Sequence, residues 1–289
     1  MTFRTDRDLA GTVSRLFIHP VKSCAGIAVP EALLTPTGLE WDRTWMVVDA
    51  RGDFVTQRTA PRMALVSPEL QAPDLVLRAP DMPALQLALH AMGPVMEVRV
   101  WDDAVPAWDV GDQAARWFTA FLRQPCRLVR FDPAHRRLSS LRRTGGIEAP
   151  NQFADAYPVL LTSEASLREL NERLGTAGAS AVDMDRFRAN IVIDGVESHD
   201  EDRIDSLFID TGGEGSCLKP VKPCTRCPIP DIDPLTALSS PEVSTALRAY
   251  RQDARVNGAI TFGMNSIVLE GAGRLVRVGQ RVSADWQFD

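Results

Sequence analysis

The chain has 289 residues, of which 45% are hydrophobic and 24% are charged, a composition typical of a folded globular protein with a sizeable core. The formal net charge is −6, which excludes wholesale electrostatic binding to nucleic acid or to an anionic membrane. No run of eighteen apolar residues occurs, so we expect no membrane-spanning helix.

The start of the chain and its cysteines indicate a reducing environment. Residues 1–10 are polar and charged and lack the apolar segment of a secretory signal peptide. The five cysteines are an odd number, and a chain of this length without a secretion signal does not call for a disulfide framework. The sequence therefore predicts a cytoplasmic protein.

Short strands dominate the predicted secondary structure. The clearest pattern lies at 96–100, where apolar residues alternate with Glu97 and Arg99, the period of a half-buried strand. A glycine-rich turn at 212–215 precedes another strand. In chain order, the predicted strands are 13–18, 45–48, 64–66, 75–77, 96–100, 128–131, 190–193, 216–221 and 266–269.

Three helices are predicted from capping residues and apolar stripes. Asp112 caps a segment that ends at 122, and Ser163 caps a helix that reaches 174 and ends at Gly175. Ser240, followed by proline, opens a third helix that continues to 250. Their apolar faces predict core contacts. Many strands with few helices indicate an α+β, β-dominated fold that is barrel-like.

The segment 222–234 is the most informative part of the sequence. It holds Cys224 and Cys227, and the neighbouring Lys222 and Arg226 favour the ionised thiolate. Four prolines within the segment fix φ and remove backbone donors. They predict an exposed, preset loop rather than a helix or a central strand.

The spacing of the two cysteines admits several chemistries. Structural zinc needs four ligands, and the only nearby candidates are Cys217 and His199. A thioredoxin-like dithiol needs a helix at the pair, which Pro228 and Pro230 disfavour. The cysteines can also be a loop pair without function, or one thiolate can bind a cofactor metal or carry sulfur. Spacing alone does not choose among these.

Other polar residues do not form a catalytic triad in the sequence. His19, His90 and His135 are not paired with a nucleophile, and we expect each to be structural. Asp231 and Asp233 follow the cysteines, and we expect them to shape a proline-rich turn. No glycine-rich nucleotide loop of either common type is present.

Nine segments together, in order along nearly the whole chain, resemble the MOSC proteins, which are named for the C-terminal domain of molybdenum cofactor sulfurase. Among them are the His-Pro-Val-Lys-Ser-Cys run within 18–27 and the Cys-x-Arg-Cys motif at 224–227. The branch that this chain resembles includes the mitochondrial amidoxime reducing component and its bacterial relatives. The segments are 18–27, 38–49, 54–58, 153–158, 161–167, 186–193, 224–227, 262–265 and 278–279.

The resemblance implies two packed β-barrel domains with a few helices, an N-terminal MOSC barrel over 1–125 and a MOSC domain over 126–289. It also implies a pyranopterin molybdenum cofactor between them, with Cys227 as the catalytic metal ligand. A soft thiolate suits molybdenum, and buried anionic groups need charge-assisted donors. The implied cofactor-binding residues are Lys22, Ser23, Arg43, Thr162, Ser163, Arg188, Asn190 and Cys227.

Each of these residues also has a plain structural interpretation. Arg43 fits a strand-surface cation, Ser163 a helix cap, and Asn190 a turn before a strand. Arg58 and Arg62 either line the mouth of the site or form a solvated basic edge. The resemblance favours cofactor binding for the implied cofactor-binding residues, and it does not decide between the two interpretations of Arg58 and Arg62.

In function, the resemblance implies reduction of N-hydroxylated compounds such as amidoximes, hydroxylamines and N-hydroxylated bases. Some relatives carry a fused iron–sulfur domain, and this sequence has no such cysteine set after the final strand, so we expect a separate electron-transfer protein or reductase. Proline and isoleucine at 228–230 stand where some relatives have threonines. A stiffer, less hydroxylated wall favours a different choice of substrate, so the resemblance supports the cofactor more strongly than the substrate. The alternative is a sulfur-carrier or cofactor-handling protein with Cys227 as a persulfide.

Overall fold

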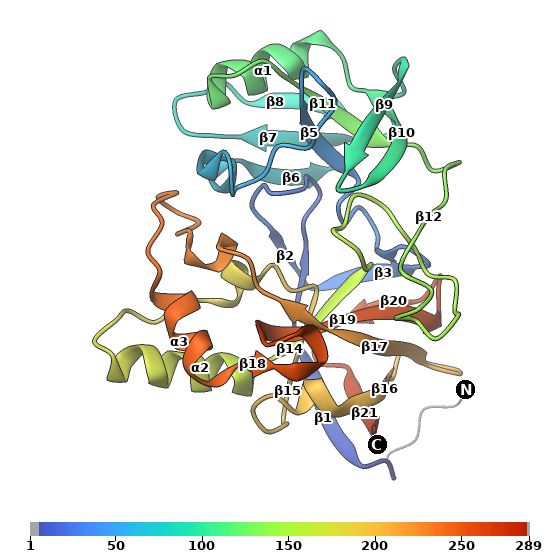
Figure 1. Ribbon diagram of the computed structural model, residues 1–289. Helices are drawn as coiled ribbons and strands as arrows, with labels where there is room; N and C mark the ends of the chain where they lie inside the picture. The colour runs from blue at the N-terminus through green and yellow to red at the C-terminus, as the bar shows by residue number, and fades with distance from the viewer. Residues whose placement is uncertain (1–5, 288–289) are drawn as a thin grey trace.

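Strands outnumber helices in the computed structural model, which describes residues 6–287 (Figure 1). Residues 1–5, which belong to the polar start of the chain, and residues 288–289 lie outside the described residues. Two halves are visible in Figure 1, an upper one with α1 and a lower one with α2 and α3. The β-dominated α+β fold is confirmed.

The lower half is a closed barrel of seven strands. The strands pair in the order β14, β15, β1, β21, β16, β17 and β19, and a pairing between β14 and β19 closes the ring. Only the β14–β15 pair is parallel among these neighbours. The bounds are β14 (Val159–Ser163), β15 (Ile191–Asp194), β1 (Leu9–Ile18), β21 (Arg281–Trp286), β16 (Ile204–Ile209), β17 (Ser216–Thr225) and β19 (Ala259–Glu270).

Inward side chains of these strands fill the barrel. Val13, Leu16, Leu161, Ile191 and Leu207 are almost fully buried in one cluster, as the alternation of side chains along a strand requires. Short strands extend the lower half: β2 (Ile27–Val29), β3 (Glu31–Thr35), β4 (Gly38–Leu39), β18 (Gln252–Asp253) and β20 (Leu275–Arg277).

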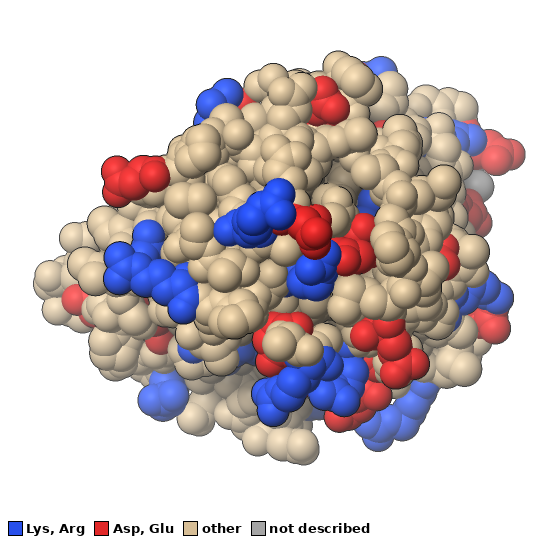
Figure 2. Space-filling model, turned by 90° about the horizontal axis from the view of Figure 1, so that it is seen from above, with Lys and Arg blue, Asp and Glu red and all other residues tan. Residues whose placement is uncertain are grey.

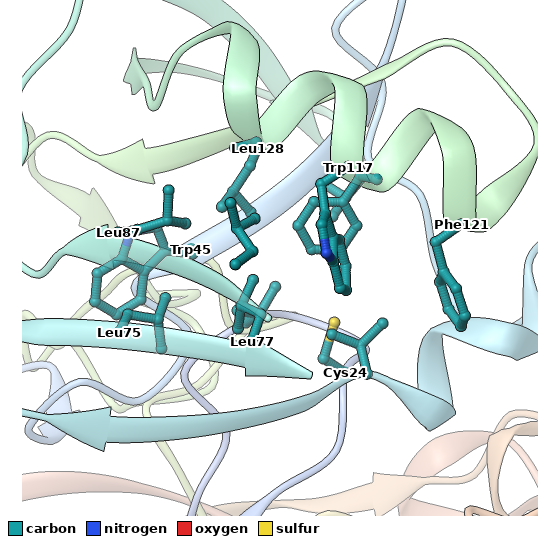
Figure 3. Packing of buried hydrophobic residues seen from close by; sticks show 14 of the residues in the cluster. Cys24, Trp45, Leu75, Leu77, Leu87, Trp117, Phe121 and Leu128 are labelled. Atoms are coloured by element: carbon teal, nitrogen blue, oxygen red, sulfur yellow. The ribbon is translucent and has the colours of Figure 1, made fainter. Parts of the chain in front are cut away.

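The upper half contains two sheets and one helix. Strands β5, β11, β10 and β9 form one sheet, and β6, β7 and β8 form the other. Helix α1 contributes Trp117 and Phe121 to one buried cluster, which also includes Trp45, Leu75 and other core residues of the sheets (Figure 3). The bounds are β5 (Trp45–Asp49), β6 (Ser67–Gln71), β7 (Asp74–Arg78), β8 (Leu85–Ala88), β9 (Val95–Val100), β10 (Asp103–Asp109), α1 (Asp112–Leu122) and β11 (Cys126–Phe131).

The two halves do not follow one cut in the sequence. Strand β1, from the start of the chain, belongs to the lower barrel, where it pairs with β15 and β21. Strand β11 lies beyond the expected boundary at 125/126 and belongs to the upper half, where it pairs with β5 and β10. The chain therefore crosses between the halves more than once, and each half depends on segments from both expected domains.

Helices α2 (Glu164–Thr176) and α3 (Glu242–Tyr250) cover the barrel on one side (Figure 1). The predicted cap at Ser163 is confirmed, because its side chain accepts the backbone N–H of Ser166, although the helix runs past Gly175. The other two caps were wrong: Gly111 caps α1, and Pro241 caps α3. Short 3₁₀ helices are η1 (Pro61–Leu65), η2 (Met184–Phe187), η3 (Asp200–Arg203), η4 (Ile229–Asp231) and η5 (Ala254–Val256).

Two predicted segments differ from the structure. The strand expected at 64–66 is mostly the 3₁₀ helix η1, opened by Pro61 and closed by a turn bond from Val66 to Met63. The segment 222–234 does not start as a loop, because β17 continues to Thr225 and pairs with β19. Its prolines are tolerated because this end of β17 has β19 as its partner on one side only and shifts register beside them.

Surface features agree with the composition. Within the described residues, none of the helices has the length and hydrophobicity to span a bilayer. On the face seen from above, basic side chains stand in small groups beside acidic ones rather than in one broad basic field (Figure 2). A face of this kind offers no extended electrostatic track for a nucleic-acid backbone.

Candidate functional site

A polar cleft lies between the two halves and brings together most of the predicted site residues. Six of the eight line it, from segments as far apart as 22–43, 188–190 and 224–227. A wider outer chamber of about 630 Å³ shares the cysteine segment with the inner cleft, and this size suits a small-molecule site. The six residues are Lys22, Ser23, Arg43, Arg188, Asn190 and Cys227.

Lys22 reaches across the cleft from the first half. Its Nζ donates a hydrogen bond to Phe153 O at 2.8 Å and forms an ion pair with Asp155. Burial lowers the pKa of Lys22, and Arg43 and Arg137 act in the same direction although Asp155 opposes them. Partial burial acts against ionisation of Asp155, but Lys22 and Arg58 hold the pKa of that carboxyl well below its usual range. The pair is therefore charged at neutral pH.

Arg43 and Asn190 join the halves. Arg43 donates to Asn190 Oδ1 at 3.0 Å and to the carbonyl of Arg188 at 2.9 Å, and it forms an ion pair with Asp42. Asn190 also accepts the backbone N–H of Leu160 at 3.0 Å. Asn190 is buried, so its amide holds two strand ends in place while it borders the cleft.

Arg188 is a half-buried cation whose guanidinium lacks a full set of partners. One of its nitrogens donates to the carbonyl of Cys24, while the other, Nη2, is buried without a hydrogen-bond partner. Burial, together with the nearby Arg43, lowers the pKa of Arg188 to about 10. Burial, Arg188 and Arg43 also lower the pKa of His19 well below its usual value. Positive charge is therefore in excess here, and an anion would stabilise it.

Backbone strain gathers around the same place. Ser23, Arg43 and Arg188 have φ of 66°, 50° and 57°, the left-handed region that residues other than glycine seldom adopt. Such strain costs on the order of 1–3 kcal/mol for each residue, and it persists where the surrounding structure fixes it. Three strained residues on one cleft indicate that the position of their side chains matters.

Only two of the five cysteines are accessible. Cys224 and Cys227 are half-buried on the cleft, whereas the other three are buried. Burial raises the pKa of Cys24 to about 12 despite the nearby Arg188, and that of Cys217 also to about 12, so these thiols are inert. Cys126 lies in β11 and Cys217 in β17.

Arg226 adds a second cation to the cysteine segment. Its Nη1 lies 3.0 Å from Cys224 Sγ, and its Nη2 donates to the carbonyl of Phe187 at 2.9 Å. Its Nε is buried without a partner. Arg226 therefore holds Cys224 at the cleft, and a cysteine sulfur is a soft ligand that suits a soft metal.

Thr162 and Ser163 do not reach the cleft. Thr162 is fully buried and its hydroxyl donates to Met184 Sδ at 3.3 Å. Ser163, also fully buried, caps α2 and donates to Glu201 at 2.8 Å. Their hydroxyls are already used within the fold, so the structure gives them packing and capping roles rather than contact with a cofactor.

The remaining residues weighed from the sequence also have definite places. Arg58 lines both chambers, whereas Arg62 lies over the Phe121 ring at 4.5 Å and lines neither. His19 Nε2 lies 3.2 Å from the carbonyl of Ala189, a structural contact. Asp233 accepts the backbone N–H groups of Leu235 and Thr236, so the prediction that it shapes a turn is confirmed, whereas Asp231 accepts the backbone N–H of Ser244 at the start of α3.

The zinc and dithiol interpretations find no support. Across residues 6–287, no group of three or more His, Cys, Asp or Glu side chains is placed to hold a metal ion. The cysteine pair is followed only by the three-residue η4, which is too short to act as the helix of a thioredoxin-like site.

Several cleft residues were missed or given no role in the sequence. Tyr157, Asn265 and Trp101 line the cleft or its outer chamber. Asp155 lies within the segment 153–158 that carries the resemblance, but its pairing with Lys22 appears only in the structure. Trp101 had none, because it lies in a hairpin turn far along the sequence from the cysteines.

The donor set fits a pyranopterin molybdenum cofactor. The unpartnered Arg188 Nη2, the surplus of buried cations and the strained Ser23 and Arg43 suit a phosphate and the polar edge of a pterin. The accessible Cys227 thiol, which lines the same cleft, suits a soft metal. The cleft thus offers an anion-binding side and a thiolate side.

This fold and site define a MOSC protein with both of its domains. Residues 10–125 match the MOSC N-terminal beta barrel domain, and residues 148–283 match the MOSC domain. Within that class, the chain belongs to the family of the mitochondrial amidoxime-reducing components, which confirms the resemblance.

Curated relatives match along most of their length. Mitochondrial amidoxime-reducing component 1 of Mus musculus is 36% identical over 286 residues, which are 94% of this chain and 82% of that protein. The Homo sapiens component 1 is also 36% identical, with the same coverage. Component 2 of Rattus norvegicus is 36% identical over 253 residues, 83% of this chain and 72% of that protein.

Proposed function

We propose that the protein is a molybdenum-cofactor-binding oxidoreductase that reduces N-hydroxylated compounds, such as amidoximes, hydroxylamines and N-hydroxylated bases, to the parent amines and amidines. One observation carries the proposal. The cleft combines under-compensated buried cations, led by Arg188, with the accessible thiol of Cys227. The names of the relatives, amidoxime-reducing components, support the reaction.

The residues that line the cleft have separate roles. Lys22, Ser23, Arg43 and Arg188 hold the phosphate and the pterin edge, because a buried anion needs several charge-assisted donors. Cys227 supplies the protein thiolate for the metal. When bound, the cofactor supplies the two-electron chemistry that removes an oxygen atom from nitrogen.

The overall reaction requires two electrons and two protons. The N–O bond of the substrate breaks, its nitrogen keeps the electron pair and a proton, and the oxygen leaves as water. The Lys22–Asp155 pair lies at the cleft, where the carboxylate fixes in place the ammonium that holds the cofactor.

We further propose that the electrons come from a separate electron-transfer protein or reductase, and that the protein is cytoplasmic, binds no nucleic acid and does not span a membrane. The cleft opens to solvent through the outer chamber, so a small-molecule substrate enters from this side. The alternative function, a sulfur carrier with a persulfide on Cys227, rests on the accessibility of the same thiol.

One experiment separates the two functions. The protein is produced in a host that makes the cofactor, and bound molybdenum and pterin are measured for the wild type, Cys227→Ser and the matched control Cys224→Ser. Turnover of benzamidoxime with an artificial donor is then recorded. The reductase proposal expects cofactor and turnover in the wild type and the control, and loss of both molybdenum and turnover in Cys227→Ser. Transferable sulfur on Cys227 without molybdenum would favour the sulfur carrier.

A further inference from the structure

An aromatic ring stands exposed at the mouth of the cleft. Trp101 lies in the turn between β9 and β10 and is 48% exposed, and it is the one aromatic residue among the large exposed hydrophobic residues in 6–287. It lines the same outer chamber as Cys227, although the two come from different halves. A large apolar ring left open beside a polar site calls for an explanation.

Neighbouring side chains hold the ring in place. Its Nε1 donates to Asp155 Oδ1 at 3.3 Å, and the Arg58 guanidinium lies 4.6 Å from the ring centroid. The ring of Phe54 meets it edge-on, with the centroids 5.1 Å apart. A ring fixed on several sides loses little freedom when a ligand binds, so it is preorganised for contact.

The turn itself does not explain the tryptophan. Trp101 has a φ of 56°, in the left-handed region, where a bulky residue is an outlier. Glycine or asparagine would form this turn without the steric cost. The strained backbone instead keeps the ring at the chamber, which is the kind of outlier from which a functional role can be inferred.

We propose that Trp101 forms an aromatic subsite, which takes the planar aromatic part of the substrate while the N-hydroxyl group points toward Cys227. Stacking on an aromatic side chain is tolerant of the exact ring, so aryl amidoximes and N-hydroxylated bases share this subsite. Small aliphatic N-hydroxylated compounds have no planar ring and gain nothing from it. The reaction in this inference rests on the proposed function, and the preference for aromatic over aliphatic substrates rests on Trp101.

The kinetic test compares an aromatic with an aliphatic substrate. For Trp101→Ala we expect the KM of benzamidoxime to rise roughly tenfold, in line with the loss of one stacked ring, while its kcat and both constants for acetamidoxime stay near wild type. Trp101→Phe should restore most of the benzamidoxime KM. The matched control is Trp286→Ala, which removes another tryptophan that carries an arginine, Arg203, 5.0 Å from its ring centroid. An equal change for both substrates, or none, overturns the subsite.

A binding measurement separates this inference from the proposed function. Calorimetric titration of the cofactor-loaded protein with benzamidoxime should give a Kd roughly tenfold lower for the wild type than for Trp101→Ala. If benzamidoxime binds in this way but is not reduced, the proposed function fails and the subsite stands. If the two proteins bind it equally, or the wild type does not bind it, the subsite is refuted whatever the activity.

Discussion

Replacing Arg188 by methionine should stabilise the cofactor-free protein. Burial and the nearby Arg43 lower the pKa of Arg188 from 12.5 to about 10, which corresponds to a penalty of about 3 kcal/mol for the buried charge. The substitution also removes the hydrogen bond to the carbonyl of Cys24, at about 1.5 kcal/mol. The difference between these two terms is a net increase of roughly 1–2 kcal/mol in the free energy of unfolding. Both side chains carry the same strain at this φ.

The assay is urea unfolding of protein from a host that cannot make the cofactor. Arg188→Met should unfold at higher urea than the wild type. The same protein from a cofactor-competent host should retain less pterin, because a cation that meets the bound anion is gone. Arg186→Met is the matched control, since Arg186 is paired with Asp233 at 3.0 Å and its loss should not stabilise. A cofactor-free Arg188→Met that is less stable than the wild type, or that keeps its pterin, refutes the reasoning.

Three further predictions follow from single side chains. Burial and Asp202 raise the pKa of Glu201 to about 7 from 4.5; the folded state therefore holds this proton more tightly, and wild-type stability falls as pH rises between these values. In urea unfolding, the free energy of unfolding of Glu201→Gln minus that of the wild type should increase by up to about 3 kcal/mol between about pH 5 and about pH 8. A difference that does not change with pH would contradict this. Thr162→Val should leave the pterin content of the folded protein unchanged, since its hydroxyl does not reach the cleft; a clear loss in pterin analysis would reverse that placement. In the cofactor-free protein, a thiol reagent should modify Cys224 and Cys227 quickly and the buried cysteines only on unfolding, and mass spectrometry that finds a third fast site would be inconsistent with the structure.

Much of the fold could be predicted from local patterns. Period-two alternation located strands such as 96–100, and Ser163 marked the start of α2, because these signals act within a few residues. The strand at 222–225 could not be found in this way. Its four-residue stretch contains a proline, and only the one-sided pairing with β19 makes that acceptable. The place of β1 in the barrel depends on pairings with β15 and β21 across most of the chain, which no local pattern encodes.

The site was partly predictable for the same reason. Lys22, Arg43, Arg188 and Cys227 stand in recognisable motifs, and the fold brings them to one cleft. Thr162 belonged to such a motif too, but its side chain faces Met184 instead, and the direction of a buried side chain is set by tertiary packing. Contacts across the cleft, such as the one between the Trp101 ring and Asp155, appear only once the halves are assembled.

The central claim is that Cys227 and the cations of the same cleft hold a molybdenum cofactor. The most direct measurement is the molybdenum and pterin content of the protein purified from a cofactor-competent host, for the wild type, Cys227→Ser and Cys224→Ser. The account predicts close to one molybdenum and one pterin for each wild-type and Cys224→Ser chain, and loss of molybdenum in Cys227→Ser. A wild type that contains neither, or a Cys227→Ser variant that retains its molybdenum in full, would contradict it.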